Sequence, residues 1–200
     1  MSDPPVVAEA DVAYVREGFV ELDELSARHG RDPAAMRAAI AEGTLPAPSY
    51  ALADGTEMVP EDYFDLADDA GGLERIRVVF LERYRTAAAR ETATLASAEA
   101  EWEDYLSGLY GVCLKRVTPE TIVRKSALVL ELDGLLAEPQ PAEPEWASAV
   151  RERVDELDAL ERPFAPTYDR LRFGGPSSRD RLVTATRERY PELFAVGATR

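Results

Sequence analysis

The stretch that decides the fold of the N-terminal part is residues 22–62, which read LDELSARHGRDPAAMRAAIAEGTLPAPSYALADGTEMVPED. Its first half holds two short apolar runs at helical spacing, each followed by a glycine that can end a helix. Asp32 before Pro33 is typical of a helix start, because aspartate caps free N–H groups and proline fits the first helical position. Asp54-Gly55 between two apolar runs predicts a β-hairpin. The expected order is therefore two helices followed by a hairpin.

Further helices are expected on both sides of this stretch. One precedes it over residues 10–18, and another begins at Pro60 and stops at Gly71-Gly72. Beyond these glycines, apolar residues recur at helical spacing in one long or kinked helix over residues 73–106 and in later helices that begin near Pro119, Trp146 and Ser178. The segments between them, 109–114 and 164–176, are expected to lack helix. We therefore predict a mainly α protein with a disordered tail (1–9), a small module with one short β-hairpin (10–71) and a helical bundle (72–200).

The composition is that of a soluble globular protein with a surplus of acid. The 200 residues include 23 basic and 38 acidic side chains, for a net charge of −15, and 46% are hydrophobic. This balance argues against nucleic acid and anionic membranes as partners, because neutralising phosphates requires a surplus of Lys and Arg. No segment approaches the roughly 18 apolar residues of a membrane span, and the N-terminus lacks a secretion signal, so we expect a cytoplasmic protein. With one histidine and one cysteine, we expect neither a metal nor a cofactor.

Positive charge is concentrated in two segments of this acidic chain. Residues 115–125 hold four bases and one acid, including both lysines of the protein, and residues 169–190 hold six arginines and three acids. In the second segment a glycine pair and two serines precede a helix, where N–H groups, hydroxyls and guanidinium groups would bind a carboxylate, sulfate or phosphate. The predicted binding residues are Arg172, Ser177, Ser178, Arg179 and Arg181, assisted by Arg124 or Lys125.

A structural interpretation of the same residues stays open. The serines would then cap the last helix, and the arginines would pair with acids of neighbouring helices. Only one of Arg124 and Lys125 is expected to face the serine-containing loop, because adjacent residues of a helix point in different directions. Convergence of the two basic segments on a concave pocket would favour a small ligand, whereas a flat face would favour a protein partner.

Other chemically active residues are interpreted as structural. His29 ends a helix before Gly30, a position that favours an imidazole as a terminal hydrogen-bonding group. Cys113 lies in an apolar run and is interpreted as a small core residue, because a cysteine nucleophile needs a base and there is no second histidine. The acidic run 101–105 is either a source of an acid/base pair or a solvated helix face. No catalytic residue is named by the sequence.

Three short segments of the N-terminal module carry a resemblance. Residues 22–27 are similar to a first helix, residues 33–40 to a recognition helix and residues 43–46 to the lead into a wing. Over residues 20–66 the chain resembles the winged helix-turn-helix of MerR-type and excisionase-type proteins. This implies a winged helix-turn-helix-like module and, as an alternative function, a MerR-like transcriptional regulator of a biosynthetic cluster. Residues 31–42 carry two arginines and two acids, a balance that disfavours DNA contact.

A second resemblance extends over most of residues 10–191. Segments 51–60, 105–113 and 172–176 are similar to an actinobacterial family of unknown function whose members are labelled natural product biosynthesis proteins. This resemblance implies a role in secondary metabolism and supplies no catalytic residues. We therefore expect recognition of an anionic small molecule or carrier-bound intermediate. The protein would act as a cofactor-independent tailoring enzyme, by elimination, cyclisation or transfer, or as an accessory subunit that binds an acidic carrier or enzyme partner.

Overall fold

The computed structural model describes residue 7, residues 9–165 and residues 167–195. It confirms a mainly helical fold with a short β-hairpin. The predicted disordered tail (1–9) lies mostly outside the described residues. Within it, Val7 is buried and donates its N–H to the carbonyl oxygen of Ala51 at 3.2 Å. In the part of the chain that the structure describes, no helix has the length and apolar character needed to cross a membrane.

The N-terminal module packs short helices around a small antiparallel sheet. Its elements are α1 (Glu9–Gly18), β1 (Val20–Glu21), α2 (Leu22–Arg28), α3 (Pro33–Ala41), β2 (Tyr50–Ala51), β3 (Glu57–Val59) and α4 (Asp65–Ala70). The strand order β1-β3-β2 confirms the predicted hairpin of β2 and β3 and adds β1, which is too short to show an alternating pattern. Asp32 caps α3 as predicted, because its carboxylate accepts the N–H groups of Ala34 and Ala35. The resemblance to a winged helix-turn-helix stays a prediction.

The second part of the chain is built from helices of unequal length. They are η1 (Leu73–Arg75), α5 (Ile76–Ala88), α6 (Ala98–Leu106), α7 (Leu109–Cys113), α8 (Pro119–Ala137), α9 (Pro144–Leu160), α10 (Tyr168–Phe173), the π-helix η2 (Arg179–Thr184), α11 (Ala185–Arg189) and α12 (Pro191–Phe194). Residues 89–97 separate α5 from α6, so the helix expected over residues 73–106 is broken rather than continuous. The expectation that 109–114 and 164–176 lack helix is wrong, because packing stabilises α7 and α10 although each is too short to show a periodic pattern.

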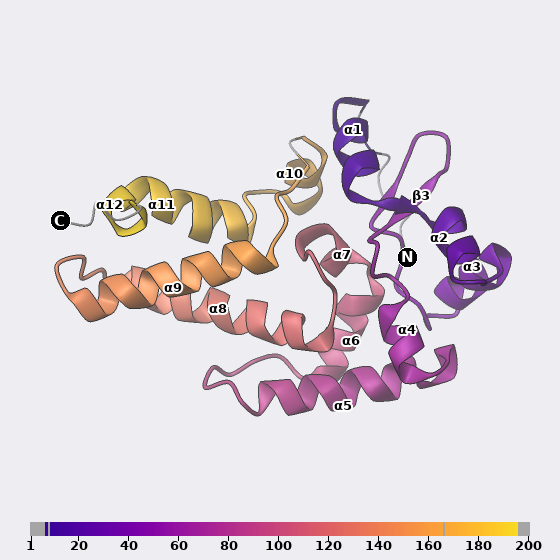
Figure 1. Cartoon of the computed structure of the whole chain (residues 1–200), viewed down its shortest axis with the longest axis horizontal. Helices are drawn as coiled ribbons and strands as arrows, with labels where there is room; N and C mark the ends of the chain where they lie inside the picture. Colours follow the sequence, from indigo (N-terminus) through magenta and orange to yellow (C-terminus); the bar gives the residue numbers. More distant parts are fainter. Residues whose placement is uncertain (1–6, 8, 166, 196–200) are drawn as a thin grey trace.

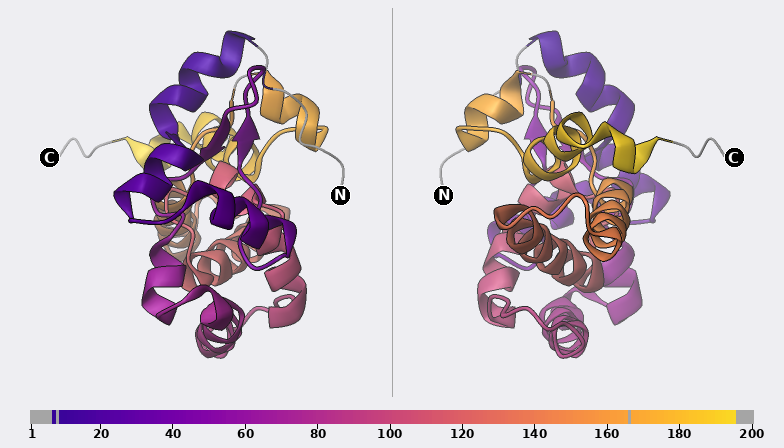
Figure 2. Two further views of the ribbon diagram at one scale, coloured as in Figure 1. Left: turned by 90° about the vertical axis from the view of Figure 1, so that its right-hand side faces the viewer. Right: turned by 90° about the vertical axis from the view of Figure 1, so that its left-hand side faces the viewer.

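The long helices lie in layers, with α5, α8, α9 and then η2 with α11 following one another across the molecule (Figure 1). The N-terminal module covers the end of the bundle at which α6 and α7 lie, and α10 lies near α1 in the views of Figures 1 and 2. A buried cluster crosses the boundary predicted at residues 71–72, since Leu22 and Leu25 belong to the same cluster as Phe80 and Trp102. The module and the bundle therefore share a core, and their seam is a packed interface.

Candidate functional site

Most of the basic residues predicted to bind an anion face acidic side chains of the same protein. The acids belong mainly to α9, which lies between the two basic segments, and we call Asp155, Glu156 and Asp158 the acidic side of α9. The ion pairs are Arg124 with Glu156, Arg179 with Asp158, Arg181 with Asp133 of α8, and Arg187 with Asp155 and Asp158. These pairs match the structural interpretation of the arginines, in which they neutralise neighbouring helices.

The two serines and Arg172 also have partners within the chain. The Ser177 hydroxyl accepts the N–H of Asp180 at 3.0 Å, and the Asp180 carboxylate accepts the N–H of Ser177 at 3.2 Å. Ser178 donates its hydroxyl to Glu161, and Arg172 donates to a backbone carbonyl of the N-terminal module at 2.8 Å. Anion binding by the arginine and serine residues stays a prediction. One member of the predicted set, Lys125, lines a pocket, and this pocket is the candidate site.

An open pocket of about 280 Å³ lies where α6, α7 and α8 meet the chain at the two ends of α10. We call it the lysine pocket. Its volume is close to the lower end of the range for ligand sites, roughly 300–1,000 Å³, and its walls combine apolar side chains with a few polar groups, as such sites do. The lining residues are Asp104, Leu109, Tyr110, Cys113, Lys125, Phe164 and Phe173.

Lys125 brings a buried positive charge to the wall of this pocket. Its side chain is 15% exposed, and its Nζ donates to the Cys113 sulfur at 3.1 Å and lies 3.3 Å from the carboxylate of Glu161. Glu161 is 1% exposed and also accepts the hydroxyl of Ser178, so Lys125 and Ser178 of the two basic segments share one carboxylate. Burial disfavours the ammonium, but the Cys113 sulfur and the Glu161 carboxylate outweigh it, so the pKa of Lys125 lies above its ordinary value. The lysine is therefore charged at neutral pH.

Cys113 packs against the main buried cluster and also lines the pocket, so its interpretation as a core residue describes only one of its two sides. Its side chain is half-buried, and besides Lys125 its sulfur contacts the carbonyl oxygen of Tyr110 at 3.6 Å. The apolar run around it forms α7, which buries Gly111 and Val112 and leaves Cys113 at its last residue. The polar partner of the sulfur is a charged lysine from another helix, and no local sequence pattern links the two.

Backbone contacts fix the position of Cys113 relative to Glu161. Hydrogen bonds of 2.9 and 3.0 Å join residues 113–115 to residues 160–162 as a short antiparallel bridge. The guanidinium group of Arg162 donates to a carbonyl of the first segment at 3.0 Å. The segments that carry the sulfur and the carboxylate are therefore held together by backbone hydrogen bonds, which is the kind of support that keeps functional groups in place.

The partly buried Tyr110 forms another wall of the lysine pocket, and its hydroxyl contacts a buried carboxylate. The Tyr110 hydroxyl donates to Glu101 of α6, and Asp104 of the same helix lies at the rim. Burial raises the pKa of Glu101, although the hydrogen bond from Tyr110 and the nearby Lys125 act in the opposite direction. A carboxyl group whose pKa is raised by burial beside a pocket is a candidate for proton transfer. The acidic run 101–105 thus contains a buried member, and is not only a solvated face.

The aromatic wall of the lysine pocket is positioned by the N-terminal module. Phe173 is the last residue of α10 and Phe164 lies in the segment before this helix, and their ring centroids are 5.0 Å apart. The Tyr50 hydroxyl of β2 donates to the buried Asp169 of α10 at 2.7 Å, and Asp11 of α1 accepts backbone N–H groups at the start of α10. The N-terminal module therefore fixes the position of α10, and through α10 it positions the aromatic wall of the lysine pocket.

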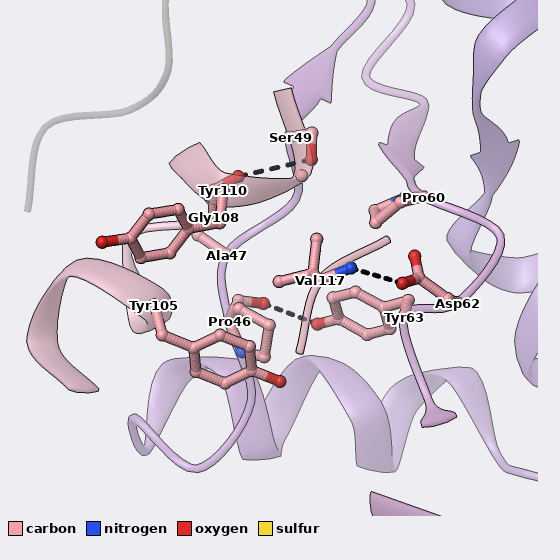
Figure 3. A pocket seen from close by; sticks show the side chains of 11 residues that line it. Pro46, Ala47, Ser49, Pro60, Asp62, Tyr63, Tyr105, Gly108, Tyr110 and Val117 are labelled. Carbon is pink, nitrogen blue, oxygen red and sulfur yellow. Dashed lines mark hydrogen bonds between the residues drawn. The ribbon is translucent and has the colours of Figure 1, made fainter. Parts of the chain in front are cut away.

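A second cavity, at the seam between the module and the bundle, is much smaller (Figure 3). Its volume is about 20 Å³, which is room for about one water molecule. The hydrogen bonds drawn across it in Figure 3 are Ser49 to the Gly108 carbonyl at 3.3 Å, Tyr63 to the Pro46 carbonyl at 2.5 Å, and the Val117 N–H to Asp62 at 2.6 Å. A Cβ at Gly108 would lie 2.1 Å from the carbonyl oxygen of Ala47, so the two chain segments touch here. The seam cavity is a packing feature, too small for an organic ligand.

The lysine pocket contains residues that no sequence pattern groups together. Tyr110, Phe164 and Phe173 lie in segments predicted to lack helix, and Cys113 lies in a run predicted to belong to the core. They converge only through the packing of α7 and α10. Among the described residues, no three carboxylate, histidine or cysteine side chains stand in a group that could hold a metal ion.

Comparison with known proteins gives a family but no function. Residues 76–191 match the model of DUF6058, a family of unknown function. No curated protein and no solved structure matches the chain. All residues that line the lysine pocket lie within the matched range, whereas Asp11 and Tyr50, which position its aromatic wall, lie before it. Because the match covers more than half of the chain, the protein belongs to the DUF6058 family.

Proposed function

We propose that the protein binds a small carbonyl compound in the lysine pocket and acts on it as a cofactor-independent enzyme of secondary metabolism. The observation that carries the proposal is the ammonium group of Lys125, held by buried partners at the wall of a pocket of about 280 Å³. The phenylalanines would contact the apolar part of the ligand, and the ammonium would orient its oxygen. The resemblance to natural product biosynthesis proteins supports the metabolic setting.

The charges around the pocket favour a carbonyl oxygen over a highly charged group. Glu161 neutralises Lys125, and Asp104 adds negative charge at the rim. An ammonium group has three N–H donors, and Cys113 and Glu161 use two of them, so the third is available to a ligand oxygen. This arrangement suits a neutral acyl group or a single carboxylate, and it disfavours phosphates. The sequence predicts an anionic ligand of any kind, and the proposal restricts it to a compound with an acyl group or a single carboxylate.

The pair of Tyr110 and Glu101 supports a catalytic role over an accessory one. A binding subunit requires no proton-transfer group, whereas elimination, cyclisation or acyl transfer each moves a proton. The Tyr110 ring lines the pocket, and its hydroxyl reaches the buried Glu101 carboxylate, whose pKa is raised by burial. The pair would exchange a proton with a ligand bound next to Lys125.

The alternative function, a MerR-like regulator, gains no support from α3. Arg37, on the helix expected to contact DNA, donates to Glu57 and to Asp23 at 2.6 Å each. Such pairs leave little positive charge for phosphates, on which binding to DNA depends.

The proposal is tested by comparing two partly exposed apolar residues. Phe173 is 38% exposed and lines the pocket, whereas Leu130 is 47% exposed on α8 and is not among the lining residues. We expect Phe173→Ala to weaken binding of short-chain carboxylates and acyl thioesters by about tenfold, because the ligand loses an aromatic contact worth about 1.4 kcal/mol. Leu130→Ala should bind like the wild type. Ligand-observed NMR titration measures both affinities, and equal affinities in all three proteins would overturn the proposal.

The metabolic setting has its own test in the producing organism. Complementation of an in-frame deletion with wild type, Leu130→Ala or Phe173→Ala separates pocket function from protein abundance. Accumulation of one intermediate in the deletion and in the Phe173→Ala strain supports a lost enzymatic step. A joint fall of all pathway metabolites and their transcripts would instead favour the regulator.

A further inference from the structure

Cys113 is a nucleophilic group to which the proposed function gives no role. It is the one cysteine of the chain, and its sulfur stands at the pocket wall 3.1 Å from the ammonium of Lys125. The thiolate is the reactive form of cysteine, and a neighbouring positive charge favours it over the thiol. The other contact of the sulfur, with a carbonyl oxygen at 3.6 Å, is weak.

Glu161 pairs with the lysine. Its buried carboxylate lies 3.3 Å from the ammonium group, and one of its oxygens has no hydrogen-bond partner among the described residues. A buried carboxylate keeps the lysine charged and aimed at the sulfur, as the third member of a nucleophile, activator and orienting group does in other covalent enzymes. The other titratable groups around the pocket are Asp104, Tyr110 and Glu101.

We propose that Cys113 is a nucleophile that accepts an acyl group from a thioester bound in the lysine pocket. This inference rests on the proposed function and names the substrate class of the same site. Lys125 has two roles in it, because its ammonium stabilises the thiolate and donates a hydrogen bond to the oxygen of the acyl group.

The step balances without an oxidant or reductant. The Cys113 proton first passes to solvent, and the thiolate attacks the carbonyl carbon, so that a new C–S bond forms while the C=O electron pair moves to oxygen. The Lys125 ammonium stabilises that oxyanion. When the C=O bond re-forms, the bond from carbon to the original sulfur breaks, and the leaving thiolate takes a proton from solvent.

A thioester demands less of the residues present than an ester or amide does. Alkoxide and amine leaving groups require a proton from a nearby acid, which histidine commonly supplies. The single histidine of this chain, His29, pairs with Asp68 in the N-terminal module. A thiolate departs without such help, so acyl transfer from a thioester needs only Cys113 and Lys125, whereas an ester or amide would also have to draw a proton from the pair of Tyr110 and Glu101.

The test is acetylation of the full-length protein by S-acetyl-N-acetylcysteamine, followed by intact mass and peptide mapping. We expect the wild type to gain one acetyl group at Cys113 and Cys113→Ser to gain none. Lys125→Met combined with Glu161→Gln removes both buried charges together, and it should react about tenfold more slowly, since only about a few per cent of an ordinary thiol is ionised at neutral pH. Lys115→Met is the matched control, because Lys115 donates to a backbone carbonyl and should leave the rate unchanged.

Comparison with a free thiol separates activation of the sulfur from a purely structural role. At neutral pH the wild type should react faster than free N-acetylcysteine, whereas the double variant should react at the rate of the free thiol. Thermal melting of each variant confirms that it is folded. Equal rates in the wild type, the double variant and free thiol would overturn the inference, and so would an acetyl group that maps to Lys125.

A non-reactive thioether analogue distinguishes this inference from the function on which it rests. Binding of the analogue without acetylation by the thioester would overturn the nucleophile and leave the proposed function standing. Absence of binding by either compound would overturn both.

Discussion

Arg124 and Lys125 are adjacent in sequence, yet they belong to regions of opposite character. Arg124 faces the acidic side of α9, where it donates two hydrogen bonds of 2.6 Å to Glu156. Lys125, rotated by about 100° on the same helix, reaches the lysine pocket and the Cys113 sulfur. Both residues lie in one basic segment of the sequence. The difference teaches that a local surplus of positive charge in the sequence does not locate a binding site. The site is located by which side chains point toward a cavity and which point toward acids of the same chain.

From this comparison we expect the largest change in the free energy of unfolding for Lys125→Met. Removal of the ammonium leaves the Glu161 carboxylate buried without its counter-charge, and breaking such a pair costs about 3 kcal/mol of the free energy of unfolding. Urea denaturation measures this loss. The added substitution Glu161→Gln should restore most of it, because no uncompensated charge then remains. A loss below about 0.5 kcal/mol for the single variant would show that the pair is effectively solvated.

Asp158→Ala should have the next largest effect, on the opposite side of the comparison. Asp158 accepts from both Arg179 and Arg187 and is 26% exposed, so its removal leaves two guanidinium groups without a shared partner. We expect a loss of about 1.5 kcal/mol in thermal or urea unfolding. Asp155→Ala is the control, since Asp155 contacts Arg187 alone and is more exposed. Similar losses in the two variants would mean that pairing one carboxylate with two arginines contributes no extra stability.

The pH dependence of stability tests the ion pair between Arg124 and Glu156. The Arg124 guanidinium holds the pKa of this carboxyl below its ordinary value of 4.5. A lowered pKa in the folded state means that its stabilising contribution is present above pH 4.5 and is lost as the pH falls through the folded pKa. Relative to the wild type, Glu156→Gln should be slightly less stable at neutral pH, by about 0.5 kcal/mol. Its melting temperature should fall less steeply below pH 4.5. Parallel pH profiles would contradict this assignment.

The smallest effect is expected for Arg181→Ala. Its ion pair with Asp133 is solvent-exposed on both sides, and exposed pairs contribute about 0–0.5 kcal/mol. Stability and affinity for a carbonyl ligand should both match those of the wild type in the titrations described above. A loss of ligand binding in this variant would instead indicate that the ligand binds at the arginines of residues 169–190.

The sequence predicted those features that depend on local chemistry. The cap at Asp32, the hairpin around Asp54-Gly55 and the helix that begins at Pro119 all follow from residues that are close in sequence. The short helices α7 and α10 were missed, because a helix of five or six residues has no periodicity of its own and depends on packing.

The lysine pocket was predictable only in part, through Lys125. The identity of its partners depends on distances between segments that are remote in sequence. Glu161 is 36 residues from Lys125 and Phe173 is 48 residues away, and no spacing rule joins them. The predicted anion site at the arginines was not located by their charge, because the chain has 38 acids and these supply partners for most of the arginines once the helices pack.

The hydrogen bonds from β2 and α1 to α10 join the DUF6058 region to the chain that precedes it. The groups proposed to react, Cys113 and Lys125, lie inside the DUF6058 region, whereas Tyr50 and Asp11, which position the aromatic wall, lie outside it. Under the proposed function, substitutions in the N-terminal module would alter which molecules fit and leave the reacting groups unchanged. Selectivity and reactivity would then depend on separate parts of the chain.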